Sequence, residues 1–206
     1  SGYVLLGYLI EKVSGTTYAN FVHDNIFAPL GMKDSGYDSS TEKIERRAIG
    51  YSPGQNGPEV ASFIDMTIPF SAGGLYPTRE DLLLWEQALF GGKILSAASC
   101  EKMTTPFRNK YGMGVAVEPG PKGGKLISHS GGIEGFNTNV TFVTSDRLAV
   151  IVLANLNGPA ADAISADIVK VAEHQSVTLI SDRVVVPVPV ESLDPFVGNY
   201  RVDGGP

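Results

Sequence analysis

Apolar residues recur at helical spacing in several stretches of the chain. The pattern opens at 1–14, where SGYVLLGYLIEKVS places its apolar side chains on one face. It predicts further helices over 17–27 and 79–90, a short helix from Ser96, and a last helix over 159–173. These helices flank a central region with a different period.

The helix over 79–90 has the clearest boundaries. Thr78 is a candidate N-cap residue, Asp81 occupies the capping-box position, and Gly91 and Gly92 end the helix. Its large apolar side chains are expected to face the core. They are Leu82, Leu83, Leu84, Trp85 and Leu89.

Strand patterns occupy the segment between these helices. They fall at 111–118, 125–129, 137–143 and 147–154, with turn residues at 120–124 and 145–147. Helices, an antiparallel meander and then another helix indicate an α+β fold, in which an antiparallel sheet is flanked by helices. This order argues against a parallel, doubly wound sheet.

The pattern also predicts how the chain is divided. Residues 31–72 are rich in turn-forming residues and are expected to be irregular. We expect a main domain over 1–178 and a linker over 179–192, where Pro and Val alternate. Residues 193–206 begin with the pattern of a new strand. Because the chain opens directly on a helix pattern, we expect it to be a fragment of a longer protein.

Composition narrows the class of protein. The chain has 206 residues, of which 43% are hydrophobic and 18% charged, which is typical of a folded domain. The one cysteine, Cys100, excludes a disulfide framework and a multi-cysteine zinc site. A net charge of −6 with interspersed signs argues against nucleic-acid binding.

The string HSGGIEGF at 129–136 is the leading candidate for chemistry. A histidine followed by small residues on a strand lets a substrate lie against bare backbone, whose N–H groups can stabilise an oxyanion. The other interpretation is a glycine-rich hairpin whose His129 lies at the surface. The residues alone leave both interpretations open.

Two nucleophile motifs also occur. GYSPG at 50–54 fits G-x-S-x-G, and Ser52 with Asp81 and His129 would follow the α/β-hydrolase order. A nucleophile elbow needs a buried strand before the serine and a helix after it, whereas a charged segment precedes Ser52 and a loop pattern follows. The S-x-x-K matches at Ser40–Lys43 and Ser99–Lys102 fall on polar, exposed segments, so neither is expected to supply a nucleophile.

The remaining histidines do not suggest a metal site. His23 lies within a predicted helix and His174 at the end of another, where a cation suits the helix dipole. Three separated histidines without acidic neighbours at ligand spacing predict neither a metal nor a cofactor.

An ordered series of segments resembles the serine beta-lactamase-like family. These segments are SGYVLLGYLIEKVSG, YANFVHDNIFAPLGMKDSGY, SAGGLYPTREDLLLWEQALFGGKIL, YGMGV, HSGGIEGF and VIVLAN. The family includes class C beta-lactamases, low-molecular-weight penicillin-binding proteins (carboxypeptidases), D-aminopeptidases and esterases. The resemblance covers about residues 1–175 and implies part of a beta-lactamase/transpeptidase-like fold. The tail LDPFVGNYR is similar to the opening of a small β domain appended to some members, so residues 193–206 are expected to be the start of a truncated small β domain.

The resemblance assigns roles to individual residues. His129, Ser130 and Gly131 match the family's third motif, in which His replaces Lys, with His129 as the catalytic residue. Gly132 falls where the family donates a backbone N–H to the oxyanion. Gly73 and Gly74 match a turn beside the cleft, and Asn155 matches the end of a core strand, where it is expected to cap the turn into the last helix. Three further residues are candidates for lining the cleft: Tyr76, Phe136 and Asn137.

The family's other two catalytic motifs are absent. The S-x-x-K that carries the nucleophile and the Tyr-x-Asn motif are expected before Ser1. The resemblance therefore implies the C-terminal portion of a serine hydrolase, inactive by itself, whose partner is the N-terminal part of the same protein. The alternative is a non-catalytic ligand-binding or regulatory module of the same fold.

The implied reaction is acyl transfer through an acyl-enzyme on a small-molecule or peptide substrate with an amide, ester or lactam carbonyl. No cofactor or metal is expected. Histidine lacks the fixed charge of the lysine it replaces, so we expect weak selection for a substrate carboxylate and weak beta-lactamase activity. The resemblance implies a periplasmic or secreted protein, although the residues themselves specify no compartment.

Overall fold

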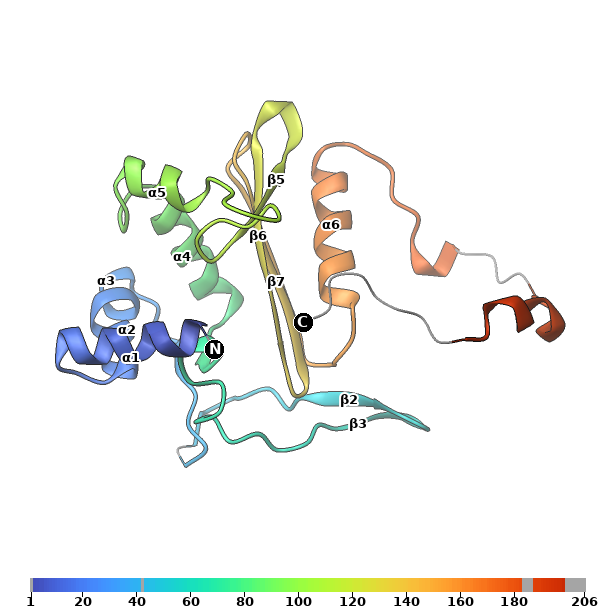
Figure 1. The fold of residues 1–206 in the computed structure, drawn as a ribbon, viewed down its shortest axis with the longest axis horizontal. Helices are drawn as coiled ribbons and strands as arrows, with labels where there is room; N and C mark the ends of the chain where they lie inside the picture. The colour runs from blue at the N-terminus through green and yellow to red at the C-terminus, as the bar shows by residue number, and fades with distance from the viewer. Residues whose placement is uncertain (1, 42, 183–186, 199–206) are drawn as a thin grey trace. The chain divides into compact units, whose positions relative to one another are not determined.

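The computed structural model describes residues 2–41, 43–182 and 187–198 (Figure 1). The chain forms two compact units, Ser1–Gln175 and Ser176–Pro206. The first unit combines helices with an antiparallel sheet, so the predicted α+β class is confirmed.

Four helical segments open the first unit. They are α1 (Gly2–Ser14), α2 (Tyr18–Val22), the π-helical turn η1 (His23–Phe27) and α3 (Ala28–Leu30). The last three follow one another without a break, and Thr17 caps the first of them by accepting a hydrogen bond from the Asn20 N–H at 3.2 Å. Buried Val22, Phe27 and Met32 form a core cluster against which Trp85 packs.

Helix α4 (Arg79–Phe90) begins as predicted, with the Thr78 hydroxyl accepting from the Asp81 N–H at 3.2 Å. The capping box is incomplete, because the buried Asp81 carboxylate accepts instead from the Asp34 N–H at 2.8 Å and from the Ser35 hydroxyl at 2.7 Å. Asp81 therefore fastens the start of α4 to a segment far away in the sequence.

The predicted core face of α4 is wrong at two leucines. Leu89 is buried and Trp85 packs on the core, but Leu83 is 41% and Leu84 39% exposed. Successive helical residues are rotated by about 100°, so three consecutive leucines cannot all face one side. The buried face of α4 includes Asp81 and Glu86 instead.

The main sheet has four antiparallel strands in the order β5-β6-β7-β8. Their bounds are Ala116–Pro119, Lys125–Ile133, Phe136–Val143 and Leu148–Ala154. The meander was predicted, but the first strand begins later than expected and the second extends four residues further. The extension arises because residues 130–133 pair with 136–139 of β7, which overrides the low strand propensity of glycine.

Helices cover both faces of this sheet (Figure 1). Helix α6 (Ala160–Ala172) packs on β7 and β8, where Val169 joins the buried Val143 and Val150. On the other face, the ring of Phe90 from α4 stacks on Phe142 with centroids 4.2 Å apart. Phe142 and Val143 are consecutive on β7, so their side chains point to opposite faces of the sheet, Phe142 toward α4 and Val143 toward α6.

The loop predicted over 31–72 contains strands that the sequence did not indicate. β1 (Gly36–Tyr37) pairs with β4 (Leu75–Tyr76), and β2 (Tyr51–Gly54) forms a hairpin with β3 (Gly57–Val60). Pro and Gly are unfavourable in strands, and they occupy four of the eight positions of this hairpin. The short helix predicted from Ser96 is α5 (Ala97–Met103), and the Ser96 hydroxyl caps it by accepting from the Ser99 N–H at 3.2 Å.

The second unit contains two described 3-10 segments, Ile180–Asp182 and Val190–Phe196. Residues 199–206 lie outside the described residues, so the predicted linker and small β domain stay predictions. Within the described part of the chain, every helix is too short or too polar to cross a membrane.

Candidate active site

The strand β6 has an open edge where the candidate motif lies. Strand β5 pairs with β6 only as far as the Ala116–Ser128 pair, so residues 129–133 pair with β7 alone among the described strands. In an antiparallel ladder, part of the backbone N–H and C=O groups of this stretch points away from β7. The predicted site residues are consecutive on this open stretch of β6, and all four are exposed: His129, Ser130, Gly131 and Gly132.

The two glycines keep this edge bare for different reasons. A Cβ added at Gly131 would lie 2.5 Å from the Thr138 hydroxyl of the neighbouring strand, so a side chain there requires the Thr138 side chain to move. A Cβ at Gly132 would meet the Asn137 amide nitrogen at 3.3 Å, a tight contact. A ligand can therefore lie directly against the backbone of β6.

The imidazole of His129 is held at both nitrogens. Its Nδ1 lies 2.6 Å from the carbonyl oxygen of Ser130, and its Nε2 lies 2.9 Å from the hydroxyl of Tyr111. The rings of Tyr111 and His129 meet edge to face, with centroids 5.9 Å apart. The contact with Tyr111 was missed by the sequence analysis, which quoted YGMGV but gave Tyr111 no role.

A cavity of about 1770 Å³ lies in front of this edge. His129, Ser130, Gly131 and Gly132 line one wall, while Trp85 and Glu86 of α4 line another. Two of the three other candidates, Tyr76 and Phe136, also line it, and so does Gly73. Asn137 does not, because its amide oxygen accepts hydrogen bonds from Asn157 at 3.0 Å and from the Gly158 N–H at 2.9 Å.

The cavity wall carries unusual carboxylates. Asp38 is buried and forms an ion pair with Arg47 at 2.7 Å. Glu86 is 5% exposed, and its Oε2 has no hydrogen-bond partner among the described residues. Burial raises the pKa of Glu86 to about 7, because a carboxylate without a donor or cation is poorly solvated there.

The turn before α6 is organised by Asn157 and not, as predicted, by Asn155. The Asn157 amide oxygen accepts from the Gly135 N–H at 2.7 Å, and its nitrogen donates to the Ile133 carbonyl at 2.8 Å. Asn155 instead donates to the Ile49 carbonyl at 2.8 Å, and Pro159 is the residue at the N-cap of α6. Asn157 reaches the β6–β7 turn because the chain folds back beyond β8, which local spacing does not reveal.

The rejected nucleophiles lie away from the cavity. Ser52 sits on β2 with no helix after it, and its hydroxyl donates to the Asn157 amide oxygen at 3.0 Å. The Ser40 hydroxyl accepts from the Met66 N–H at 3.0 Å, and Ser99 is exposed on α5. None of the three lines the cavity.

The other two histidines are exposed and isolated from this site. The side chain of His23 hydrogen-bonds to the adjacent Asp24 at 2.8 Å, and His174 follows the end of α6. In the part of the chain that is described, His, Cys, Asp and Glu form no group of three or more able to hold a metal ion.

Comparisons with known proteins identify the family and the fold of the chain. A family model described as Beta-lactamase matches residues 1–174. The chain is 35% identical to the putative penicillin-binding protein PbpX of Bacillus subtilis over 78% of its own length and 40% of that protein. It is 26% identical to the D-aminopeptidase of Brucella anthropi, over 77% of its length and 31% of that protein.

A solved structure matches as well. The octameric penicillin-binding protein homologue from Pyrococcus abyssi superimposes with a TM-score of 0.70 at 27% identity, over 84% of this chain and 42% of that one. The chain thus spans about two fifths of the length of these penicillin-binding relatives.

Proposed function

The chain belongs to the beta-lactamase family, and we propose that it is the C-terminal portion of a serine hydrolase that works by acyl transfer. The observation that carries the proposal is the open, glycine-bare edge of β6 beside His129, which lines a large cavity. A substrate carbonyl placed there meets backbone N–H groups, with Gly132 as the proposed oxyanion donor.

The nucleophile is proposed to come from another part of the polypeptide. Ser40, Ser52 and Ser99 all lie outside the cavity lining, and the relatives are more than twice as long as the matched region. The cavity has room for a segment carrying the S-x-x-K motif, whose lysine would accept the proton of the serine hydroxyl. This chain by itself is then catalytically inactive.

The mechanism assigns separate tasks to the two parts. The serine from the other part attacks an amide, ester or lactam carbonyl, and the β6 backbone stabilises the oxyanion, a contribution of roughly 3 kcal/mol for a single donor. His129 then contacts the substrate or the catalytic tyrosine, and water hydrolyses the acyl-enzyme. Each residue of this chain binds or orients, and none forms the covalent bond.

The substrate class follows from the charge at the site. A lysine in the third motif would offer a permanent cation to a substrate carboxylate, and His129 does not. Of the five described lysine and arginine side chains that line the cavity, four are already paired with a carboxylate: Lys43, Arg46, Arg47 and Arg79. We therefore propose esters and amides as preferred substrates over lactams with a carboxylate, in line with the similarity to a D-aminopeptidase.

A panel of substrates tests this function on the intact polypeptide. A p-nitrophenyl ester, a D-amino acid amide and a cephalosporin are assayed with the wild type, His129→Ala and the distant control His174→Ala. We expect ester or amide hydrolysis well above cephalosporin hydrolysis, and a loss of about 10-fold or more in kcat/KM for His129→Ala alone. Ligand binding without turnover of any substrate would instead support a non-catalytic module.

A further inference from the structure

His129 lies at the end of a chain of hydrogen-bonding groups that starts on α1. The hydroxyls of Tyr3 and Tyr111 are 3.2 Å apart, and the Tyr111 hydroxyl is 2.9 Å from His129 Nε2. The other ring nitrogen, Nδ1, lies 2.6 Å from the Ser130 carbonyl oxygen. Tyr111 thus contacts the imidazole directly, and Tyr3 is connected to it through the Tyr111 hydroxyl.

The carbonyl oxygen of Ser130 determines where the protons sit. A carbonyl only accepts, so Nδ1 of His129 carries the hydrogen. In the neutral ring Nε2 is then the acceptor, which makes the Tyr111 hydroxyl its donor and leaves the Tyr111 oxygen to accept from Tyr3. Every group in the chain has a compatible partner in this direction.

Backbone contacts of Tyr111 hold its hydroxyl next to His129. The N–H of Tyr111 donates to the Arg108 carbonyl at 2.8 Å, and its carbonyl accepts from the Phe107 N–H at 2.9 Å. It also forms a β-bridge with Ala116, the residue that pairs with Ser128 next to His129. Burial, and the contact with Tyr3, raise the pKa of Tyr111 to about 12, so its hydroxyl stays protonated and able to donate.

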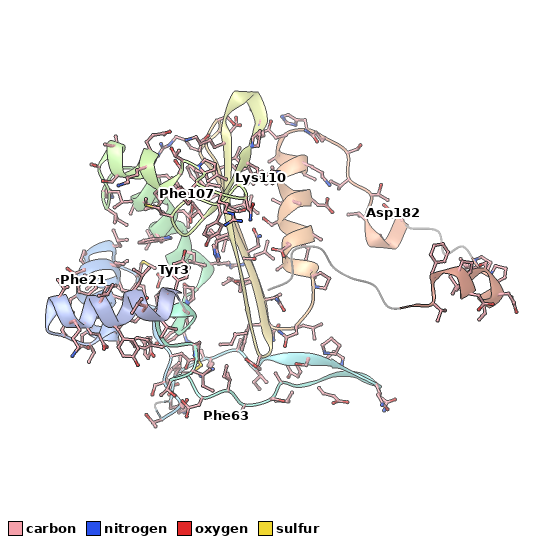
Figure 2. The ribbon with its side chains drawn as sticks, in the orientation of Figure 1. Tyr3, Phe21, Phe63, Phe107, Lys110 and Asp182 are labelled. Carbon is pink, nitrogen blue, oxygen red and sulfur yellow. The ribbon has the colours of Figure 1, made fainter. Side chains whose placement is uncertain are left out.

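Tyr3 is fixed as well. It lies on α1, in the part of the helix nearest the sheet (Figure 2), and its carbonyl accepts from the Ser71 hydroxyl at 2.8 Å. Gly7, one turn further along α1, is buried against Ser71 so closely that an added Cβ would overlap the Ser71 side chain. This close packing holds α1 so that Tyr3 can reach Tyr111.

We propose that Tyr111, supported by Tyr3, is a positioning residue that fixes the ring orientation of His129 for the reaction, and so keeps Nδ1 against the Ser130 carbonyl that selects the Nδ1–H tautomer. The kinetic side of this assignment rests on the proposed function, whereas the tautomer does not. Because both of its nitrogens are hydrogen-bonded, the imidazole is held in one orientation beside the open edge of β6. Loss of the Tyr111 hydroxyl frees Nε2 and lets the imidazole turn.

Tyr111→Phe in the intact polypeptide tests the assignment, because it removes the hydroxyl and keeps the ring. The matched control is Tyr8→Phe, a tyrosine on α1 whose ring packs on Phe70 with centroids 5.2 Å apart. The imidazole ¹⁵N resonances, assigned with His129→Gln, report the tautomer directly. Ester hydrolysis provides kcat/KM, and thermal unfolding shows that each variant is folded.

We expect the wild type to show protonated Nδ1 and unprotonated Nε2, and Tyr111→Phe to show a mixture of tautomers. We also expect Tyr111→Phe to lower kcat/KM by about 2- to 10-fold, as befits one lost hydrogen bond, with Tyr3→Phe lowering it less and Tyr8→Phe leaving it unchanged. An unchanged ¹⁵N spectrum or an unchanged kcat/KM in a folded Tyr111→Phe variant overturns the proposal. If the wild type hydrolyses nothing, the proposed function fails, and the ¹⁵N spectra still decide whether Tyr111 sets the tautomer.

Discussion

The hydroxyl of Ser52 donates a 3.0 Å hydrogen bond to the amide oxygen of Asn157. This bond joins β2 to the turn that follows β8, and it is reinforced by two backbone bonds between Tyr51 and residues 155 and 157. Ser52 is thus engaged in structure, although it occupies the centre of a G-x-S-x-G string.

Ser52→Ala is therefore expected to affect stability and leave catalysis intact. Losing one partly buried hydrogen bond should lower the free energy of unfolding by about 1 kcal/mol, while ester hydrolysis by the intact polypeptide stays at the wild-type rate. Denaturant unfolding and steady-state kinetics measure the two effects. Loss of hydrolysis in a folded variant would restore Ser52 as a nucleophile.

Asn157→Ala is expected to be much more damaging than Asn155→Ala. Asn157 serves the Gly135 N–H and the Ile133 carbonyl together with two side chains, and its removal leaves several of these groups unpaired. We expect a loss of about 2 to 4 kcal/mol in the free energy of unfolding. The side chain of Asn155 donates one hydrogen bond, to the Ile49 carbonyl, from an exposed position, so its removal should cost about 1 kcal/mol or less. Equal costs in urea unfolding would contradict the central role of Asn157.

Gly135 needs to be glycine for two reasons, a positive φ and a close contact with the Gly50 backbone, whereas Gly123 has the positive φ without the close contact. The φ of Gly135 is +84°, and an added Cβ would lie 2.6 Å from the Gly50 Cα. Gly123 has a φ of +76° with nothing within 4 Å of an added Cβ. Gly123→Ala should cost about 1 kcal/mol for backbone strain alone, and Gly135→Ala about 1 to 3 kcal/mol more because of overlap. Thermal unfolding of both variants measures the difference, and a Gly135→Ala variant as stable as Gly123→Ala would refute the close approach.

Glu86 should make the protein less stable as pH rises. Its pKa is raised from 4.5 to about 7 in the folded protein, so folding takes up a proton between these values. The contribution of Glu86 to the free energy of unfolding is fully present below pH 4.5 and decreases as the pH approaches 7. Above pH 7 this contribution, about 3 kcal/mol, is lost. This behaviour follows from burial without a partner.

Glu86→Gln removes the titrating group and should abolish this part of the pH dependence, so that the variant is the more stable protein at pH 8. Glu80→Gln, at an exposed position on the same helix, should retain the wild-type profile. Urea unfolding between pH 4 and pH 8 compares the three proteins. A wild-type profile in Glu86→Gln would show that Glu86 is paired in solution.

Much of the fold was predictable because it is encoded locally. Periodicity predicts the helices over 79–90 and 159–173 and the strands of the sheet, and the capping chemistry of Thr78 marks the start of α4. The β2–β3 hairpin was not predictable, because its Pro53 and Gly54 argue against a strand and only pairing across the hairpin stabilises it.

The candidate site was predictable in part for the same reason. His129 and the glycines after it form a contiguous string, so their residue types alone suggest an exposed, bare strand. Tyr3, Tyr111 and Glu86 reach the site through tertiary packing. Tyr3 and Tyr111 are 108 residues apart, Tyr111 and His129 are 18 apart, and Oε2 of Glu86 has no partner among the described residues. Sequence spacing carries no signal for such contacts.

The most direct test of the account is to trap and locate the acyl-enzyme of the intact polypeptide. The protein is mixed with a p-nitrophenyl ester, quenched in acid within the first turnover and analysed by intact-mass and peptide mass spectrometry. We predict a mass increase of one acyl group on a serine of an S-x-x-K motif outside residues 1–206, with less adduct in His129→Ala. No adduct, or an adduct on Ser52 or Ser99, would contradict the proposed acyl-transfer function.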